Sequence, residues 1–405
     1  MEEKKLIQIK PDIQHRSNCP YCGKVLTPKK VLWQGIHICV VSNCRHCHAE
    51  IIEDLKVGHA LYMPYQVDLR KNALFGDDKP KCWFGMPLLK SLQNPQTDSD
   101  IEFKVEKFQE FKRVIILNCI DYLYGHSLLK LLNAESYIKN NPEFGLIIIV
   151  PIFLRWLVPQ GVAEAWTVNI PLSKAQNHYP LLDQLIQKES ERFVEIYVSR
   201  AHSHPKDFNI TNFTGIDKHD FKRVDFRITF IWREDRPWWS HDFSLRVARK
   251  LNCMKPLLYW QNYKICKLFS FLRNKIQNAK FTIAGLGTST KFPKWIDDLR
   301  INQFNEDLER EACRTYAESR LVIGVHGSNM LLPSAHAGMT LDLMPYGRWN
   351  TFAQDVLYQE CDNRLSSYSY RYLPLNINTS LLAYIASLQI NGFSYFKKQM
   401  MCELL

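Results

Sequence analysis

Residues 321–333 have the sequence Leu-Val-Ile-Gly-Val-His-Gly-Ser-Asn-Met-Leu-Leu-Pro, which decides the fold of the second half of the chain. The apolar run at 321–325 predicts a short buried strand. His326 and Gly327 follow this strand directly, and the pattern at 328–337 predicts a short helix. A buried strand that turns through a glycine into a helix is typical of a parallel α/β sheet.

The same turn has the features of an anion-binding loop. Gly327 permits a close approach of the backbone to a ligand, and unpaired amides at the start of the helix would point toward it. Ser328 or Asn329 would cap the helix or donate to a phosphate oxygen. An ordinary strand-to-helix turn is the alternative. The position of this turn at a strand end in the second of two α/β segments favours phosphate binding.

Further apolar runs extend this strand into a doubly wound sheet. They predict strands at 227–232, 280–284 and 340–344, and helices at 243–251, 257–278 and 305–319. The first half of the chain alternates in the same way, with strands predicted at 113–118, 145–150 and 194–198 and helices at 127–139 and 181–193. Because a polar stretch at 200–220 separates the two series, we expect two Rossmann-like domains that face a ligand cleft.

The first sixty residues contain two Cys-x-x-Cys pairs, Cys19/Cys22 and Cys44/Cys47, with 21 residues between the pairs. Four thiolates at this spacing are typical of a closed structural zinc site, which leaves no position for a substrate. A redox function is the alternative, but no βαβ pattern follows either pair. Four nearby residues are candidates to replace one ligand: His37, Cys39, His46 and His48.

These patterns predict an α/β protein of five segments. They are a zinc ribbon at 1–60, a connecting segment at 61–105, a Rossmann-like domain with its linker at 106–222, a second Rossmann-like domain at 223–360, and a closing segment at 361–405.

Two arginines follow the strand predicted at 227–232. Arg233 and Arg236 would clamp a diphosphate, because planar guanidinium groups bind phosphate through paired hydrogen bonds. The alternative is a solvated loop in which they form ion pairs with Glu234, Asp235 or Asp242. Together with the His326-Gly327 turn, they indicate a nucleotide site.

Two stretches together resemble glycosyltransferase family 61 and its GT-B-fold relatives: I-T-F-I-W-R-x-x-R from residue 228 and V-I-G-V-H-G-S-N-M-L-L-P-x-A-x-A-G-x-T-L-D-L-M-P from residue 322. The resemblance covers roughly residues 220–360 and implies an inverting, metal-independent sugar transfer from a nucleotide-sugar donor. It implies donor contacts from Arg233, Arg236, His326 and Gly327, with Asp342 at the position of a usual Glu. Ser328-Asn329 differ from the family's common His-Gly-Ala-Gly loop, and the membrane anchor of many members is not found here.

Sugar transfer also needs a base that receives the proton of the acceptor hydroxyl. The resemblance assigns the acceptor side to the first α/β domain. Asp121 and His126, in the loop after the strand predicted at 113–118, are the first candidates, and Glu164 is held in reserve. Each of them has the structural alternative of a capping carboxylate or a surface histidine.

The charge balance limits the class of partner. The 52 Lys and Arg exceed the 41 Asp and Glu, giving a net charge of +11, which suits a nucleotide diphosphate, a nucleic acid or an acidic membrane surface. We expect a nucleotide-sugar donor and a carbohydrate or glycoconjugate acceptor, with peripheral membrane contact compatible with the charge. The rival function is a zinc-ribbon protein that binds nucleic acid or protein and carries a non-catalytic α/β scaffold.

Other enzyme classes lack their usual sequence motifs. The sequence has no P-loop, and Gly285-Leu-Gly287 lacks the third glycine of a dinucleotide fingerprint, so neither an ATPase nor a dehydrogenase is favoured. A metal-dependent phosphoesterase would need carboxylates beside His202 and His204, and no such set accompanies them. No apolar run reaches the length of a membrane span, and we expect a cytoplasmic protein with reduced cysteines.

Overall fold

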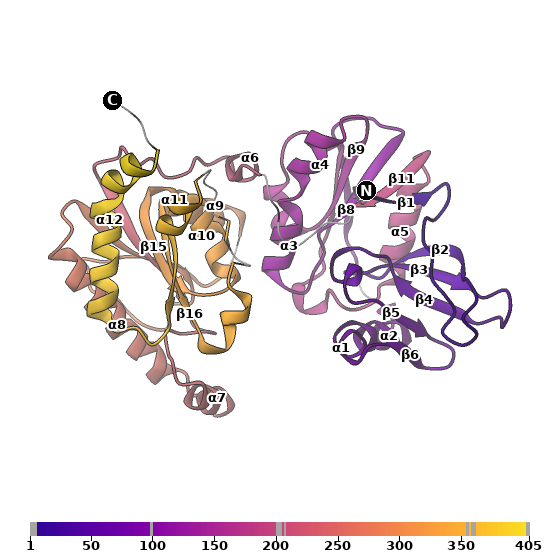
Figure 1. The fold of residues 1–405 in the computed structure, drawn as a ribbon, viewed down its shortest axis with the longest axis horizontal. Helices are drawn as coiled ribbons and strands as arrows, with labels where there is room; N and C mark the ends of the chain where they lie inside the picture. The colour runs from indigo at the N-terminus through magenta and orange to yellow at the C-terminus, as the bar shows by residue number, and fades with distance from the viewer. Residues whose placement is uncertain are drawn as a thin grey trace. The chain divides into compact units, whose positions relative to one another are not determined.

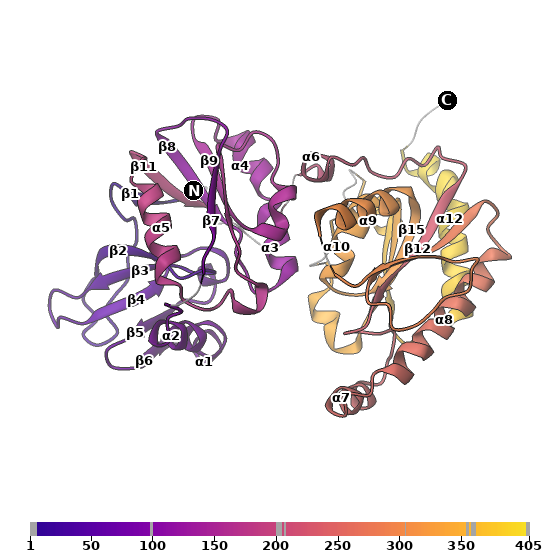
Figure 2. The same cartoon turned by 180° about the vertical axis from the view of Figure 1, so that it is seen from behind.

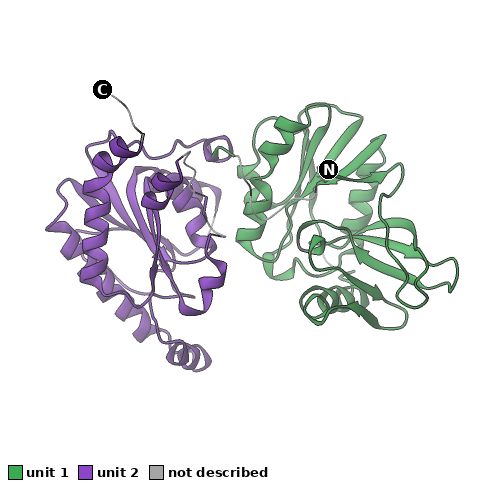
Figure 3. Ribbon diagram, viewed as in Figure 1, with its two compact units in different colours: residues 1–209 green, residues 210–405 purple. Residues whose placement is uncertain are grey.

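The computed structural model describes residues 6–97, 100–199, 205, 208–303, 305–353, 356–357 and 362–401. The chain divides into two compact units, residues 1–209 (unit 1) and 210–405 (unit 2), which Figure 3 colours separately. Each unit contains a sheet of mainly parallel strands with helices packed on it, so the predicted α/β fold class is confirmed.

Unit 1 contains a six-stranded sheet in the order β1-β11-β8-β9-β10-β7. Its strands are β1 (Leu6–Lys10), β7 (Phe103–Lys107), β8 (Arg113–Asn118), β9 (Gly145–Pro151), β10 (Glu164–Val168) and β11 (Glu195–Ser199). The four central strands are parallel, and β1 and β7 close the two edges in antiparallel pairing. The three strands predicted in this half are β8, β9 and β11, and they are confirmed.

The helix predicted at 127–139 is interrupted in the structure. It forms α3 (Tyr124–Leu131) and α4 (Ala134–Asn140), and α5 (Pro180–Ser190) matches the second predicted helix. Asn133 lies at the interruption, where its side-chain nitrogen donates to the carbonyl oxygen of Leu129 at 2.8 Å. An asparagine side chain that bonds to the preceding turn competes with the helical backbone, which accounts for the break.

A second, five-stranded antiparallel sheet lies in unit 1. Its strands are β2 (Thr27–Trp33), β3 (Ile38–Asn43), β4 (Glu50–Asp54), β5 (Tyr65–Asp68) and β6 (Ala73–Gly76), followed by α1 (Asp78–Pro80), a π-helical turn (Lys81–Gly85) and α2 (Met86–Gln93). The segment expected to be a connection at 61–105 therefore carries β5, β6, α2 and β7.

The first sixty residues share a core with the parallel sheet. Trp33, Ile38 and Val40 belong to the same buried cluster as Ile116 of β8 and Ile149 of β9. The backbone N–H of Trp33 also donates to Asp183 on α5 at 2.8 Å. So small a segment buries little apolar surface by itself, and it gains stability by packing on its neighbour.

Unit 2 contains a six-stranded sheet in the order β14-β13-β12-β15-β16-β17, with every pair parallel. Its strands are β12 (Phe226–Arg233), β13 (Ala279–Leu286), β14 (Asp297–Ile301), β15 (Ser319–Val325), β16 (Met339–Met344) and β17 (Tyr370–Pro374). The four predicted strands are β12, β13, β15 and β16, and they are confirmed. Numbered within this unit, the strand order is 3-2-1-4-5-6, the order of a doubly wound nucleotide-binding sheet.

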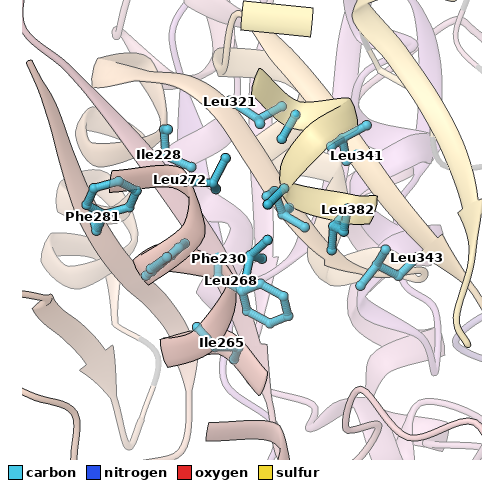
Figure 4. Close-up of a cluster of buried hydrophobic side chains, with 14 of the residues drawn as sticks. Ile228, Phe230, Ile265, Leu268, Leu272, Phe281, Leu321, Leu341, Leu343 and Leu382 are labelled. Atoms are coloured by element: carbon cyan, nitrogen blue, oxygen red, sulfur yellow. The ribbon is translucent and has the colours of Figure 1, made fainter. Parts of the chain in front are cut away.

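The helices of unit 2 are α6 (Ile210–Thr214), α7 (Asp242–Lys250), α8 (Lys255–Arg273), α9 (Glu306–Glu318), α10 (Leu331–His336), α11 (Asn363–Ser369) and α12 (Thr379–Met401). Side chains of α8 and α12, such as Ile265, Leu268 and Leu382, pack on Phe230 and Leu341 of the sheet (Figure 4). Figures 1 and 2 show α9 and α10 on the other face of the sheet. Among the described residues, no helix combines the length and apolar character that a bilayer span requires.

Candidate functional site

The donor-site candidates lie at the switch point of the unit 2 sheet. β12 and β15 are neighbours, but the chain continues from β12 to β13 on one side and from β15 to β16 on the other. Loops that leave two such strands in opposite directions open a crevice at their carboxyl ends, where doubly wound sheets bind ligands. Arg233 is the last residue of β12 and Arg236 lies in the loop that follows, while His326 to Asn329 lie in the segment after β15.

The two arginines reach across from the first loop to the second. Nη1 of Arg233 donates to the side-chain oxygen of Asn329 at 2.6 Å, and Nη1 of Arg236 donates to the carbonyl oxygen of His326 at 2.7 Å. These contacts join residues that are at least 90 positions apart in the chain. The structure therefore brings the predicted arginines and the predicted His-Gly turn together.

Arg233 also forms the ion pair considered as an alternative in the sequence. Its Nε donates to Oδ1 of Asp235 at 2.8 Å, and its Nη2 donates to Oδ2. Partial burial raises the pKa of Asp235, but the hydrogen bond and charge of Arg233 outweigh it and leave this pKa below its usual value. Asp235 holds one edge of the guanidinium, while Nη1 points to the second loop.

Gly327 lies beneath both guanidinium groups. A Cβ added to this residue would lie 2.7 Å from Nη1 of Arg233 and 2.7 Å from Nη1 of Arg236. Its φ of +144° is also one that L side chains rarely adopt. Two guanidinium groups that converge over a backbone without a side chain are an arrangement that can bind an anion.

His326 is held by a buried carboxylate. Its Nδ1 lies 2.9 Å from Oδ2 of Asp342, and the hydroxyl of Tyr370 donates to the same oxygen at 2.8 Å. Both His326 and Asp342 are almost completely buried. Since a carboxylate oxygen accepts, the pair orients the imidazole with its proton on Nδ1.

Asn329 is the residue of the second loop with an unused donor. Its side-chain oxygen accepts from Arg233, and its buried side-chain nitrogen has no hydrogen-bond partner among the described residues. Ser328 forms no side-chain cap. The helix expected at 328–337 begins as a 3₁₀ turn at Ser328–Met330 and continues as the six-residue α10. A ligand at this loop would therefore be bound by side chains and not by the N-terminus of a long helix.

Sequence reasoning missed Gln261, which fixes the arginine loop from α8. Its side-chain oxygen accepts from the backbone N–H of Trp238, and its nitrogen donates to the carbonyl oxygen of Arg233 at 3.1 Å. Gln261 is completely buried although it is polar. A lone Gln within an amphipathic helix has no distinguishing pattern, so only the packing reveals this contact.

Asp121 and His126 lie together in unit 1. Nζ of Lys130 is 2.8 Å from Oδ2 of Asp121, and Nδ1 of His126 is 3.4 Å from Oδ1. Burial raises the pKa of Asp121, but the charges of Lys130 and His126 outweigh it and leave this pKa far below its usual range. The imidazole side chain is 31% exposed, whereas the carboxylate is buried. Oδ1 of Asp121 also accepts from the backbone N–H of Leu123 at 3.1 Å. The carboxylate therefore caps its own turn and pairs most closely with Lys130, with His126 at a longer distance.

Glu164 lies on β10 with both carboxylate oxygens engaged. Arg192 donates to Oε1 at 2.8 Å and to Oε2 at 2.7 Å, and the indole nitrogen of Trp166 donates to Oε2 at 2.8 Å. Such a bidentate pair stabilises the fold around the charged carboxylate. His202 and His204 lie outside the described residues.

The four cysteines of the two Cys-x-x-Cys pairs form one cluster. Their sulfur atoms all lie within 4.8 Å of one another, and the closest pairs, Cys19 with Cys47 and Cys22 with Cys44, are 3.4 Å apart, too far for disulfides. The backbone N–H groups of Cys47 and His46 lower the pKa of Cys44 to about 6. The cluster can therefore hold one metal ion through four thiolates.

The two cysteine turns have matching backbones. Gly23 N donates to Cys19 O at 2.9 Å, and His48 N donates to Cys44 O at 2.9 Å. Both Gly23 and His48 have positive φ values, +70° and +57°. Two alternative ligands are occupied elsewhere: His37 lies 2.7 Å from Asp54, and Cys39 is buried in the core between β3 and α2.

No protein-family model and no curated protein matches the chain. Three solved structures are similar in part. They are the glycosyltransferase SnogD from Streptomyces nogalater (11% identity, 70% of this chain and 76% of that chain, TM-score 0.25), TarM (10%, 99% and 76%, TM-score 0.26), and the glycosylation associate protein complex from Streptococcus agalactiae (10%, 96% and 78%, TM-score 0.26). At these TM-scores the likeness is too weak to establish a shared fold.

Proposed function

We propose that this chain is a glycosyltransferase that moves a sugar from a nucleotide-sugar donor to an acceptor hydroxyl by a single inverting displacement, without a catalytic metal. The GT-B type and the relationship to glycosyltransferase family 61 are part of this proposal. One observation carries it: the guanidinium groups of Arg233 and Arg236 converge over Gly327 at the switch point of a doubly wound sheet.

The chemistry of the leaving group explains why this arrangement suits sugar transfer. When the bond between the sugar and the diphosphate breaks, negative charge grows on the phosphate oxygen. Preorganised positive charges and donors stabilise that charge in a partly dry site. Arg233 and Arg236 supply the charges, and the side-chain nitrogen of Asn329 supplies a further donor.

His326 and Asp342 have a positioning role in this proposal. Asp342 orients the imidazole, and the carbonyl oxygen of His326 holds Nη1 of Arg236. The pair thereby sets where the second guanidinium lies. We assign His326 and Gly327 to the same donor site, with Ser328 at its border.

Binding of nucleoside diphosphates tests the donor site. Isothermal titration with UDP, GDP, ADP and CDP should detect at least one saturable ligand, and Arg233→Ala or Arg236→Ala should each weaken it about 10- to 100-fold, the effect of a charge-assisted hydrogen bond. His326→Ala should weaken it as well. The matched control is Arg314→Ala, an exposed arginine of α9 that pairs with Glu311. Unchanged affinity in the three site variants would remove the donor site.

Turnover tests the reaction itself. With the correct donor and acceptor, activity should persist in EDTA while the structural metal stays bound, because guanidinium groups neutralise the leaving diphosphate in the proposed mechanism. The product should have the inverted anomeric configuration. A strict requirement for magnesium would contradict the metal-free step, and a retained configuration would contradict the single displacement.

The proton acceptor is proposed from the Asp121–His126 pair, with Glu164 last among the three candidates. A base that works near neutral pH needs a pKa near the working pH. The low pKa of Asp121 favours His126 as the group that takes the proton and Asp121 as its positioning residue.

Kinetics of two variants separate these roles. His126→Ala should lower kcat about 100-fold or more with little change in donor affinity. Asp121→Asn should lower kcat less and also leave donor affinity unchanged. Full activity of His126→Ala would move the base to another residue.

We further propose that the metal of the four-cysteine cluster is zinc and that its role is structural. Four thiolates complete a tetrahedron and leave no open position for water or substrate. The Cys-x-x-Cys turns and their N–H···S contacts support this metal over oxygen-preferring cations.

A further inference from the structure

Helix α7 of unit 2 presents an apolar stripe to solvent. Phe243, Val247 and Leu251 are spaced by four residues and therefore share one face, and they are 75%, 39% and 70% exposed. Leu245 is the buried side chain of the helix. Figures 1 and 2 show α7 at one end of unit 2, beyond the first turn of α8. An amphipathic helix with its apolar side outward needs a partner for that side.

Exposed aromatic side chains also lie on α8, the next helix along the chain. Tyr259, Trp260 and Tyr263 are between 49% and 60% exposed, and the rings of Trp260 and Tyr263 have centroids 5.4 Å apart. Tyrosine and tryptophan combine an apolar ring with a polar group, which suits the boundary between lipid and water.

The charge on these two helices is mainly positive, although Asp242 lies in the first turn of α7. Residues 243–296 contain eleven Lys and Arg and no Asp or Glu. Outside this stretch the remaining 41 Lys and Arg equal the 41 Asp and Glu, so the whole net charge of +11 belongs to it. Arg246 and Lys250 on α7 and Lys255 and Lys267 on α8 are exposed, and Nζ of Lys267 lies 5.9 Å from the centroid of the Tyr263 ring.

We propose that this α7–α8 face, defined by Phe243, Val247, Leu251, Tyr259, Trp260 and Tyr263 with the four exposed basic residues beside them, docks on an anionic membrane surface. An amphipathic helix with a basic border inserts its apolar side chains at the acyl boundary while its Lys and Arg contact lipid phosphates. A nucleic acid would contact the basic residues but leave the aliphatic stripe exposed. A second copy of the chain would bring like charges together.

The docking face is connected to the arginine loop of the candidate donor site. Nη2 of Arg249 on α7 donates to the carbonyl oxygen of Asp235, whose carboxylate holds Arg233. Arg249 is therefore left unchanged in the variants below, so that a loss of membrane binding is independent of nucleotide binding.

Vesicle flotation tests the proposal with the full chain. The protein should float with vesicles of equimolar phosphatidylglycerol and phosphatidylcholine, and not with phosphatidylcholine alone, and added salt should weaken this binding. Phe243→Ser with Leu251→Ser should reduce the partition coefficient at least about tenfold, because two large apolar side chains lose their burial. Arg246→Gln with Lys250→Gln should reduce it about 25-fold, at about fivefold per charge.

The matched control is Leu381→Ser with Leu388→Ser on α12. These leucines are 46% and 52% exposed, and α12 has no Lys or Arg between them in the sequence, so vesicle binding should not change. Circular dichroism and thermal unfolding check that each variant is folded.

Three results would overturn the proposal. The first is no binding of the unaltered protein to anionic vesicles. The second is equal binding by the α7 variants. The third is a different ligand for this face. In that case the Phe243/Leu251 variant would change the binding of a DNA or RNA duplex, or self-association in sedimentation, and would leave vesicle binding unchanged.

Discussion

Gly327 is the residue at which backbone conformation and site chemistry depend on each other. Its Cα lies beneath two guanidinium groups and carries no side chain. Its φ of +144° lies in a region that disfavours a Cβ. Arg233 and Arg236 can converge only because this position is a glycine. The residue was recognisable in the sequence as part of a turn, but the contacts that require it come from another loop.

We predict that Gly327→Ala separates the two guanidinium groups. The added methyl would lie 2.7 Å from Nη1 of Arg233 and of Arg236, so both groups would have to move, and it would add backbone strain of about 1–3 kcal/mol. Nucleoside diphosphate affinity, measured by titration, should fall about tenfold or more, and the thermal midpoint should drop. Gly347→Ala is the control, because a Cβ there has no neighbour within 4 Å. Equal affinities in the two variants would contradict the close approach.

At the scale of elements, the two cysteine turns act as one unit with the sheet that they border. The first turn precedes β2, and the second joins β3 to β4. Cys44 is buried, and Trp33, Ile38 and Val40 of the adjoining strands pack in the core of the parallel sheet. A metal that holds the turns therefore also supports packing in the rest of unit 1.

We predict one zinc ion per chain and a local loss of order without it. Cys44→Ser should remove the metal, because three thiolates bind far more weakly than four. Limited proteolysis should then cut within the first sixty residues before it cuts unit 2. Cys253→Ser, which alters an exposed cysteine outside the cluster, is the control. Protein purified without chelators that contains no stoichiometric zinc would contradict the assignment.

The edge strands of the unit 2 sheet are the elements that the local sequence pattern did not predict. β14, with the sequence Asp-Asp-Leu-Arg-Ile, and β17, with Tyr-Arg-Tyr-Leu-Pro, close the two edges of the unit 2 sheet. Each has few buried residues, so neither forms the continuous apolar run that identifies a central parallel strand. Their pairing depends on a neighbour that is already in place.

At the scale of the whole molecule, two buried histidines of unit 2, His219 and His336, lie together and outside the candidate donor site. The backbone N–H of His219 donates to the carbonyl oxygen of His336 at 2.8 Å, and Nδ1 of His219 lies 3.0 Å from the carbonyl oxygen of Ala317. Burial lowers the pKa of each to about 4. Both are therefore neutral in the folded unit at neutral pH.

This burial predicts that unit 2 loses stability in mild acid. The unfolded chain, with histidine pKa values of about 6.5, binds more protons than the folded unit between pH about 6.5 and about 4. As the pH is lowered through that window, the free energy of unfolding should fall by up to about 3 kcal/mol for each histidine. Hydrogen–deuterium exchange of the backbone amides in β12 and β15, followed as a function of pH, measures this loss of stability.

Variants identify the groups responsible for that loss. His336→Asn should flatten the pH dependence, whereas His241→Gln, at an exposed position of the same unit, should leave it unchanged. A stability of unit 2 that is constant from pH 7 to pH 4 would contradict the burial of these neutral rings.

The amino-acid sequence by itself determined the α/β alternation, the central strands and the spacing of the four cysteines, because these depend on apolar periodicity and short turns within a few residues. Only the tertiary structure decided the strand order, the edge strands and the core that the first sixty residues share with the parallel sheet. It also decided the convergence of Arg233, Arg236 and Asn329 over Gly327. The two arginine contacts join residues at least 90 positions apart. Such contacts, like the strand order, depend on packing between elements, which leaves no periodic pattern in either segment.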